Sequence, residues 1–412
     1  MRKLTTFAVA ILVGIMFATP AMAAEKLFIM VWNQDHAREA MEFQKVRPDV
    51  EMEVVVTPTS VYRDRIMTLH AVGEAPDVFW VNFRGTAGHE FLDANMLEDL
   101  NPWVDRSSTF HREDHHPEIM HSLGKNFLPF VPYIVSPYLF YYRADLVAAA
   151  GVEAPEIHWT IDEARDLFRR VTKRKPDGEV EMWGHDDLGR WSPWTGPLGL
   201  QFFNEDGTKV TVDNPVTKQG FEFLHQLAYV DGVIPPAGKS IRFSSGMTAS
   251  GVYGTWNLAN RQADADIGVA VLPEGPGGYK PLVLIEGWSM SAQSKNKELA
   301  WEFIEFMNSD EMQMGIAARQ DSPAKLPIAL QHAFVDQPLR HVIIETIQNG
   351  SRSDWRLDNP VVPHSVIEEA YRQLDLNAFL TNEKPLQQVI DEAVPRMQAV
   401  LDRAIAALGA GE

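Results

Sequence analysis

Strands and helices alternate over the first third of the chain, and this order restricts the fold more than any other feature. Apolar runs at 27–32, 51–57 and 77–82 have the β-branched and aromatic content of strands, and amphipathic segments at 36–45 and 60–71 separate them. Alternation of this kind is typical of a sheet with helices packed on its faces. The sequence therefore predicts an α/β, doubly wound fold for this region.

Polar residues directly follow two of these strands. Trp32, Asn33 and Gln34 end the first strand, and Asn82 and Arg84 end the third. In an open α/β sheet, ligands bind beyond the carboxyl ends of the strands. We therefore expect these residues to line a binding site, with a helix cap or a turn as the plainer role for each polar side chain.

The remainder of the chain favours a second lobe and a helical end. Aromatic strands are expected at 127–133 and 137–143, and Pro132 and Pro137 near their junction suggest a crossing between lobes. Thr160 and Glu163 have the spacing of a capping box. Further strands are expected at 250–256, 267–272 and 282–285, and helices at 215–230, 297–307, 337–348, 365–376 and 385–407. With domains of about 100 to 200 residues, 412 residues predict two domains.

The first residues read as a secretory leader. Arg2 and Lys3 precede an apolar run at 7–17, and small residues follow at 21–24, so we expect a signal peptide over 1–23. The run is shorter than the roughly 20 residues of a membrane span, and no comparable run follows. The expected location is the periplasm, in soluble form.

Cysteine count and charge exclude several classes of site and partner. The chain has 0 cysteines, which excludes disulfides, thiolate metal sites and a lipid anchor on a mature N-terminal cysteine. Loss of Arg2 and Lys3 with the leader takes the net charge from −19 to −21. Nucleic acid needs basic patches, so it is not an expected partner.

The order of several short segments resembles the extracellular solute-binding proteins of ABC importers, in the family that includes maltose-type sugar-binding proteins. The matching segments, which begin with Arg47-Pro48-Asp49, lie at 47–54, 75–78, 96–100, 141–146, 159–160, 243–249, 254–256 and 294–303. The family often has Tyr-Asn where this chain has Tyr142-Arg143, which puts a cation near the expected crossing.

The resemblance implies a type II periplasmic binding protein whose two lobes, each a mixed sheet flanked by helices, close on a ligand in the cleft between them. Lobe one would cover 25–135 and 284–326, and lobe two 136–283 and 327–412. The protein would capture a carbohydrate as a monomer and deliver it to the permease subunits of an ABC transporter, without a cofactor and without catalysis.

Eleven tryptophans suit a sugar ligand, because sugars stack their C–H faces on aromatic rings. Trp256 and Asn257 form the strongest candidate pair, at a position where the resembled family often stacks a sugar. Gly287 and Trp288 follow a predicted strand. Further candidates are Trp191 and Trp194, in a Gly/Pro-rich loop, and Trp355 in the tail. For each tryptophan, plain core packing is the alternative, and Trp80 is expected in the core.

Other functions remain open on the sequence alone. Within the same family the solute could be a polyamine or a glycerol phosphate, and a secreted glycosidase is the alternative from another class. The histidine-rich segment 111–121 is the one metal-like cluster, but its spacing matches no strict motif, and a solvated surface segment is the better explanation. No metal site is therefore predicted.

Overall fold

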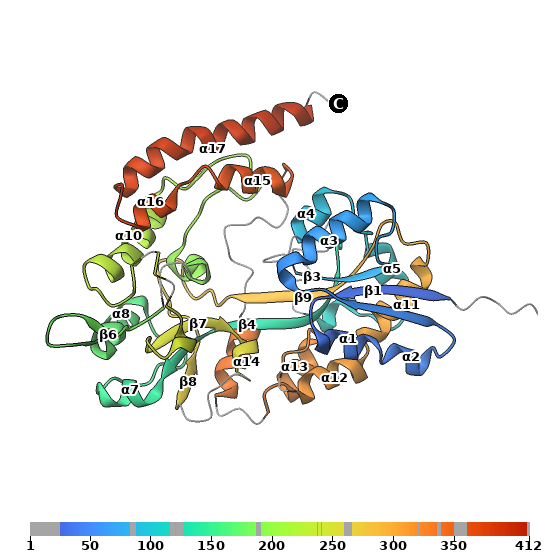
Figure 1. The fold of residues 1–412 in the computed structure, drawn as a ribbon, viewed down its shortest axis with the longest axis horizontal. Helices are drawn as coiled ribbons and strands as arrows, with labels where there is room; N and C mark the ends of the chain where they lie inside the picture. The colour runs from blue at the N-terminus through green and yellow to red at the C-terminus, as the bar shows by residue number, and fades with distance from the viewer. Residues whose placement is uncertain are drawn as a thin grey trace, which may run out of the picture.

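The computed structural model describes residues 25–82, 88–115, 120, 127–186, 191–236, 238–239, 241–258, 266–319, 321–335, 339–349 and 361–409. In this part of the chain a sheet of seven strands runs through two lobes (Figure 1). The strand order is β2-β1-β3-β9-β4-β7, and β8 pairs with β4. The strands are β1 (Lys26–Val31), β2 (Glu51–Val56), β3 (Val78–Asn82), β4 (Val131–Arg143), β7 (Ser250–Gly254), β8 (Ile267–Ala270) and β9 (Val283–Met290). A separate hairpin pairs β5 (Lys173–Arg174) with β6 (Val180–Met182).

The first lobe confirms the predicted alternation of strands and helices. β1 pairs in parallel with β2 and with β3, while β9, from much later in the chain, pairs antiparallel with β3. The sheet is therefore mixed. The helices of this lobe are α1 (Gln34–Ala40), α2 (Phe43–Val46), α3 (Thr59–Ala71), α4 (Gly88–Asp93), α5 (Asn101–Arg106), α11 (Lys297–Met307) and α12 (Asp310–Ala318). The single helix predicted over 36–45 is wrong, because a turn at Met41 and Glu42 divides it into α1 and α2.

A single strand, β4, replaces the two strands predicted over 127–143. Its first half pairs with β9 as far as Pro137, and from Tyr138 it pairs with β7. A proline lacks the N–H that a ladder needs. Pro132 lies where the register with β9 shifts, and Pro137 lies where the pairing partner changes, so neither interrupts the strand. The strand predicted at 282–285 likewise continues to Met290 as β9.

Helices surround the second half of β4 and form the tail. They are α7 (Ala144–Ala149), α8 (Ile161–Val171), α9 (Thr195–Leu198), α10 (Pro215–Tyr229), α13 (Leu326–His332), α14 (Arg340–Gln348), α15 (His364–Tyr371), α16 (Leu376–Leu380) and α17 (Leu386–Gly409). The predicted capping box is confirmed: Thr160 accepts from the Glu163 N–H, and Glu163 accepts from the Thr160 N–H. Arg143 ends β4 in this lobe and pairs with Asp145 at 3.0 Å.

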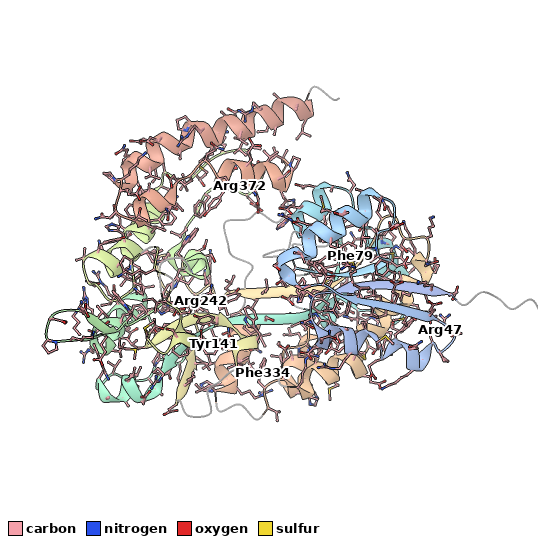
Figure 2. All side chains as sticks on the ribbon, in the orientation of Figure 1. Arg47, Phe79, Tyr141, Arg242, Phe334 and Arg372 are labelled. Carbon is pink, nitrogen blue, oxygen red and sulfur yellow. The ribbon has the colours of Figure 1, made fainter. Side chains whose placement is uncertain are left out.

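Each of the two lobes has an apolar core of its own. The first core draws its buried residues from 27–135 and 283–324, and the second from 140–272 and 362–401. A third cluster packs α13 and α14 against β4. Phe79 of the first core, and Tyr141 and Phe334 of the third cluster, are labelled in Figure 2. None of the helices within the described ranges has the length and apolar character that a membrane crossing requires.

Candidate functional site

A carboxylate and an amide lie side by side where β3 ends. Asn82, the last residue of β3, is opposite Glu286 of β9, and its Nδ2 donates to Glu286 Oε1 at 3.2 Å. Trp80 Nε1 donates to the other carboxylate oxygen at 3.3 Å. Residues opposite each other in an antiparallel pair point to the same face. The two strands therefore present an amide and a carboxylate side by side, and of these two residues only Asn82 was predicted from the sequence.

The charge of Glu286 depends on its surroundings. Burial is the main cause that raises the pKa of this carboxyl to about 7; the bonds from Asn82 and Trp80 act to lower it, and the nearby charge of Asp321 acts to raise it. Burial also raises the pKa of Asp321, against the opposing charge of Arg319. Two carboxyl groups thus share one edge of the first lobe, and Glu286 is poised to change its protonation near neutral pH.

The residues after β1 contribute an aromatic wall and a helix cap. Trp32 is partly buried and meets the rings of Tyr62 and Trp80 edge-on, with centroids 5.5 and 5.8 Å apart. Asn33 caps α1, because its Oδ1 accepts from the His36 N–H at 2.8 Å. Gln34 is exposed in the first turn of α1. Asn33 therefore has the plainer role, that of a helix cap, while Trp32 and Gln34 remain candidates for contact with a ligand.

Trp256 is the exposed aromatic ring of the second lobe. It follows β7 in a short 3-10 turn (Thr255–Asn257), and 44% of its surface is exposed. Its ring stands edge-on to Tyr138 at 5.4 Å and lies against Gly254, where a Cβ would come within 1.9 Å of the ring. Asn257 is partly buried beside it. Glycine thus permits a ring position that leaves one face available for stacking.

β4 connects the polar group of lobe one to the aromatic ring of lobe two. Glu286 lies opposite Ile134, and Gly254, which supports Trp256, lies opposite Tyr138. Four residues of a strand span roughly 13 Å, and positions four apart point to the same face. Glu286 and Trp256 therefore flank the crossing between the lobes at a separation that a small oligosaccharide or polyamine can bridge.

Trp288 and Gly287 serve the packing of the first lobe. Trp288 is fully buried, with its ring edge-on to Trp80 at 4.8 Å and to Phe303 at 5.1 Å. A Cβ on Gly287 would lie 2.0 Å from the Val131 carbonyl oxygen, so the close backbone approach expected there is to β4. The structure therefore does not support direct ligand contact by either residue. Both residues have a packing role instead.

Trp191 and Trp194 lie against the core of the second lobe. Trp194 is buried and meets the rings of Phe168 and His185 edge-on. Trp191 is partly exposed and packs on Phe202 and Phe221, at 6.0 and 5.7 Å. Only Trp191 keeps surface for a ligand. Arg84, Trp355 and the leader 1–23 lie outside the described residues.

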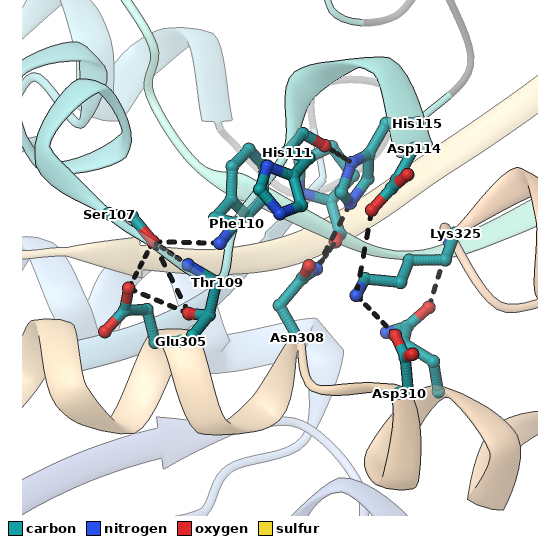
Figure 3. A network of polar contacts seen from close by, with 12 residues as sticks. Ser107, Thr109, Phe110, His111, Asp114, His115, Glu305, Asn308, Asp310 and Lys325 are labelled. Atoms are coloured by element: carbon teal, nitrogen blue, oxygen red, sulfur yellow. Dashed lines mark hydrogen bonds and ion pairs between the residues drawn. The ribbon is translucent and has the colours of Figure 1, made fainter.

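Where the histidine-rich segment is described, His111 and Glu113 are exposed, as expected, and His115 is buried in the first lobe. His115 is 1% exposed, which corrects the expectation of a solvated segment at that position. Its Nδ1 donates to the His111 carbonyl at 3.2 Å, and its Nε2 accepts from Asn308 Nδ2 at 3.2 Å (Figure 3). Burial lowers the pKa of His115 to about 4, so the ring is neutral. Across the described ranges no group of three or more His, Asp or Glu side chains could hold a metal ion.

Comparison with known proteins assigns the family. The sequence profile described as bacterial extracellular solute-binding protein matches residues 30–314, more than half of the chain. The chain therefore belongs to this family, and its fold is that of a type II periplasmic binding protein.

Individual relatives are distant. A probable ABC transporter-binding protein of Deinococcus radiodurans is 24% identical over 206 residues, 44% of this chain and only 48% of that protein. The maltodextrin-binding protein MdxE of Bacillus subtilis is 24% identical over 71% of each chain. The solved structure of the sugar-binding protein MalE from Xanthomonas citri superposes with a TM-score of 0.76 at 18% identity, covering 93% of this chain and 99% of that one. This last likeness shows the fold.

Proposed function

We propose that this protein is the periplasmic substrate-binding component of an ABC importer, and that it captures a carbohydrate between its lobes and delivers it to the membrane permease. Hinge closure of the lobes is the expected mechanism for this fold. The names of MdxE and MalE support a sugar as the solute. The proposal includes a monomeric protein that binds without turnover.

One observation carries the choice of solute. The exposed ring of Trp256 in lobe two stands against Tyr138 of β4. Glu286, which accepts from Asn82 in lobe one, lies opposite Ile134 of the same strand. A sugar offers an apolar C–H face for the ring and hydroxyl groups for the carboxylate and amide. The polar pair lies in one lobe and the aromatic ring in the other. A solute would therefore contact both only when the lobes close.

A polyamine is the second candidate, because the carboxyl groups of Glu286 and Asp321 interact, and Glu286 accepts from the indole of Trp80, whose ring meets that of Trp32. An ammonium group would relieve the repulsion between these carboxyl groups. A glycerol phosphate needs converging cations, and the cation described beside Asp321 is Arg319, which already pairs with Glu39 and Asp321. We rank these solutes sugar, polyamine and glycerol phosphate.

We further propose that the leader over 1–23 directs the chain to the periplasm, where it remains without a lipid anchor. The lobes would be 25–135 with 284–326, and 136–283 with 327–412. The two separate apolar cores support this division. Crossing strands β4 and β9 would then contain the hinge.

A thermal-shift screen of the purified mature protein tests the solute. Binding to the native state raises its stability by about 2.7 kcal/mol at a hundredfold excess over Kd. Maltose, maltotriose, other neutral sugars, spermidine, putrescine and glycerol 3-phosphate are screened separately, and hits are titrated by calorimetry. A rise in Tm with sugars supports the proposal, and a rise with spermidine alone replaces sugar by polyamine.

Chromatography of each incubated sugar supplies the control for catalysis. Saturable binding with the sugar recovered intact is the expected result. Release of a cleavage product would overturn the proposal of a binding protein in favour of a glycosidase.

A further inference from the structure

Besides the crossing strands, the two lobes meet at a second place, where α4 of the first lobe touches α15 of the tail. In Figure 1, α15 lies beside α4, away from the β4 and β9 strands. Phe91 of α4 belongs to the core of lobe one, whereas Ile367 and Ala370 of α15 belong to the core of lobe two. The segment before α15 is also tied to lobe two, since the Val361 N–H donates to the Asp206 carbonyl at 2.8 Å.

The contact is a helix cap supplied by the other lobe. α15 starts after Pro363, which makes no side-chain cap hydrogen bond. Asp93, the last residue of α4, takes that role: its Oδ1 accepts from the His364 N–H at 3.1 Å, and its Oδ2 accepts from the Ser365 N–H at 2.6 Å. A carboxylate at a helix N-terminus satisfies N–H groups that have no partner inside the helix and interacts favourably with the helix dipole.

Two imidazole rings strengthen the same contact. His364 Nδ1 lies 3.3 Å from Asp93 Oδ1, and the His364 ring stacks on that of His89 in α4, with centroids 4.0 Å apart. Both histidines are buried. Although burial acts to raise it, the pKa of Asp93 is lowered by the bonds from His364 and Ser365, so the carboxylate is charged in the contact.

We propose that Asp93 and the start of α15 form a latch that holds the two lobes in the relative position seen in this structure. The inference rests on the proposed hinge closure. Rotation about β4 and β9 that opens the lobes separates Asp93 from α15 and exposes His364 and Ser365 N–H groups without their cap. The latch therefore biases the protein toward the closed arrangement before any solute binds. A larger fraction of the protein is then in the conformation that binds the solute, and the apparent affinity for the solute rises.

The experiment measures the separation of the lobes without a solute. The chain has no cysteine, so dyes attached through Ser60→Cys on α3 and Ala406→Cys on α17 report the distance between lobes by single-molecule energy transfer. Asp93→Ala should shift the equilibrium toward the open form by about fivefold or more, the usual effect of losing a helix cap. Asp93→Asn, which keeps acceptor capacity but loses the charge, should give a smaller shift.

Asp375→Ala is the matched control. Asp375 caps α16 through the Ala378 N–H at 3.2 Å, entirely within lobe two, so its loss should leave the dye separation unchanged. Circular dichroism checks that each variant is folded. If Asp93→Ala does not fold, Asp93→Asn is used for the distance measurement instead. An unchanged separation in a folded Asp93 variant would overturn the latch. Because no solute is used, failure of sugar binding does not affect this result.

Discussion

The carboxylate of Glu286 accepts a hydrogen bond at 3.3 Å from the indole of Trp80, which lies on β3 two residues before Asn82, the residue opposite Glu286. The ring of Trp80 is fully buried and stacks on His36, with centroids 3.7 Å apart. The Glu286 carboxyl, whose pKa is about 7, is therefore hydrogen-bonded to a side chain of the first core. Its protonation is coupled to the stability of the lobe and not only to a solute.

Glu286 should make a contribution to stability that falls as pH rises from about 4.5 to 7, opposite in sign to that of the buried His115, whose lowered pKa favours folding as pH rises. Burial raises the pKa of Glu286 from its usual value near 4.5 to about 7 in the folded protein. Its contribution is thus fully present below pH 4.5 and is lost as pH rises toward and through 7, by up to about 3 kcal/mol. In urea unfolding between pH 4.5 and 8, the free energy of unfolding of the parent protein should fall relative to that of Glu286→Gln as pH rises.

The control for this prediction is Glu298→Gln, at an exposed position on α11. It should retain the parent pH profile. Equal profiles for Glu286→Gln and the parent protein would show that Glu286 does not titrate in this range.

Replacement of Trp256 by alanine should weaken solute binding without weakening the fold. The ring is 44% exposed, so its removal should change the free energy of unfolding by no more than about 0.5 kcal/mol. An aromatic anchor at a binding site is worth at least about 1.4 kcal/mol, or tenfold in Kd. Calorimetric titration with the solute found in the screen measures this loss. Met247→Ala, at a similarly exposed position of the same lobe, should bind normally, and equal affinities for both variants would remove Trp256 from the site.

Gly287→Ala should destabilise the crossing of the lobes. The added methyl would lie 2.0 Å from the Val131 carbonyl oxygen, so β9 and β4 would have to separate. A cost of about 1 to 3 kcal/mol is expected from overpacking. Gly315→Ala in α12 has open space around it and should instead gain about 0.5 to 1 kcal/mol. Urea unfolding separates the two, and a neutral Gly287→Ala would mean that the strands can adjust.

Thr160→Ala should remove about 1 kcal/mol through loss of the capping box at α8. Thr59→Ala, at the exposed start of α3, is the comparison and should change the unfolding free energy by a few tenths of a kcal/mol. The same urea series measures both. If Thr160→Ala equals Thr59→Ala, the two bonds that the Thr160 hydroxyl makes with Glu163 do not contribute to stability.

Local patterns in the sequence predicted most of the elements, because strand periodicity, proline and capping residues act over a few neighbours. The helix at 297–307 is observed with the predicted bounds, and the capping box at Thr160 is present. The joining of 127–143 into one strand was not predictable in this way. Pro132 and Pro137 read as breaks unless the register shift and the change of partner at those positions are known.

The site was predictable in part for the same reason. Asn82 ends a strand and Trp256 follows one, which makes both of them candidates, and for Trp256 the resemblance to sugar-binding proteins adds to this. Glu286 was missed although a charged residue in the apolar run 282–290 was a usable signal. Nothing local distinguishes Trp288, which is buried, from Trp256, which is exposed, since both follow a glycine or threonine beside a strand. Their difference arises from α11, which covers Trp288 through Phe303.

The position of β9 between β3 and β4 also sets the order of events during synthesis. A ribosome that has made the first 282 residues has produced β1 to β8 but not the strand that joins β3 to β4. The first lobe cannot complete its sheet until the last third of the chain emerges, and contacts between residues so distant in sequence form slowly. The first lobe therefore stays incomplete through about two thirds of translation, and its folding waits for a strand made long after its other strands.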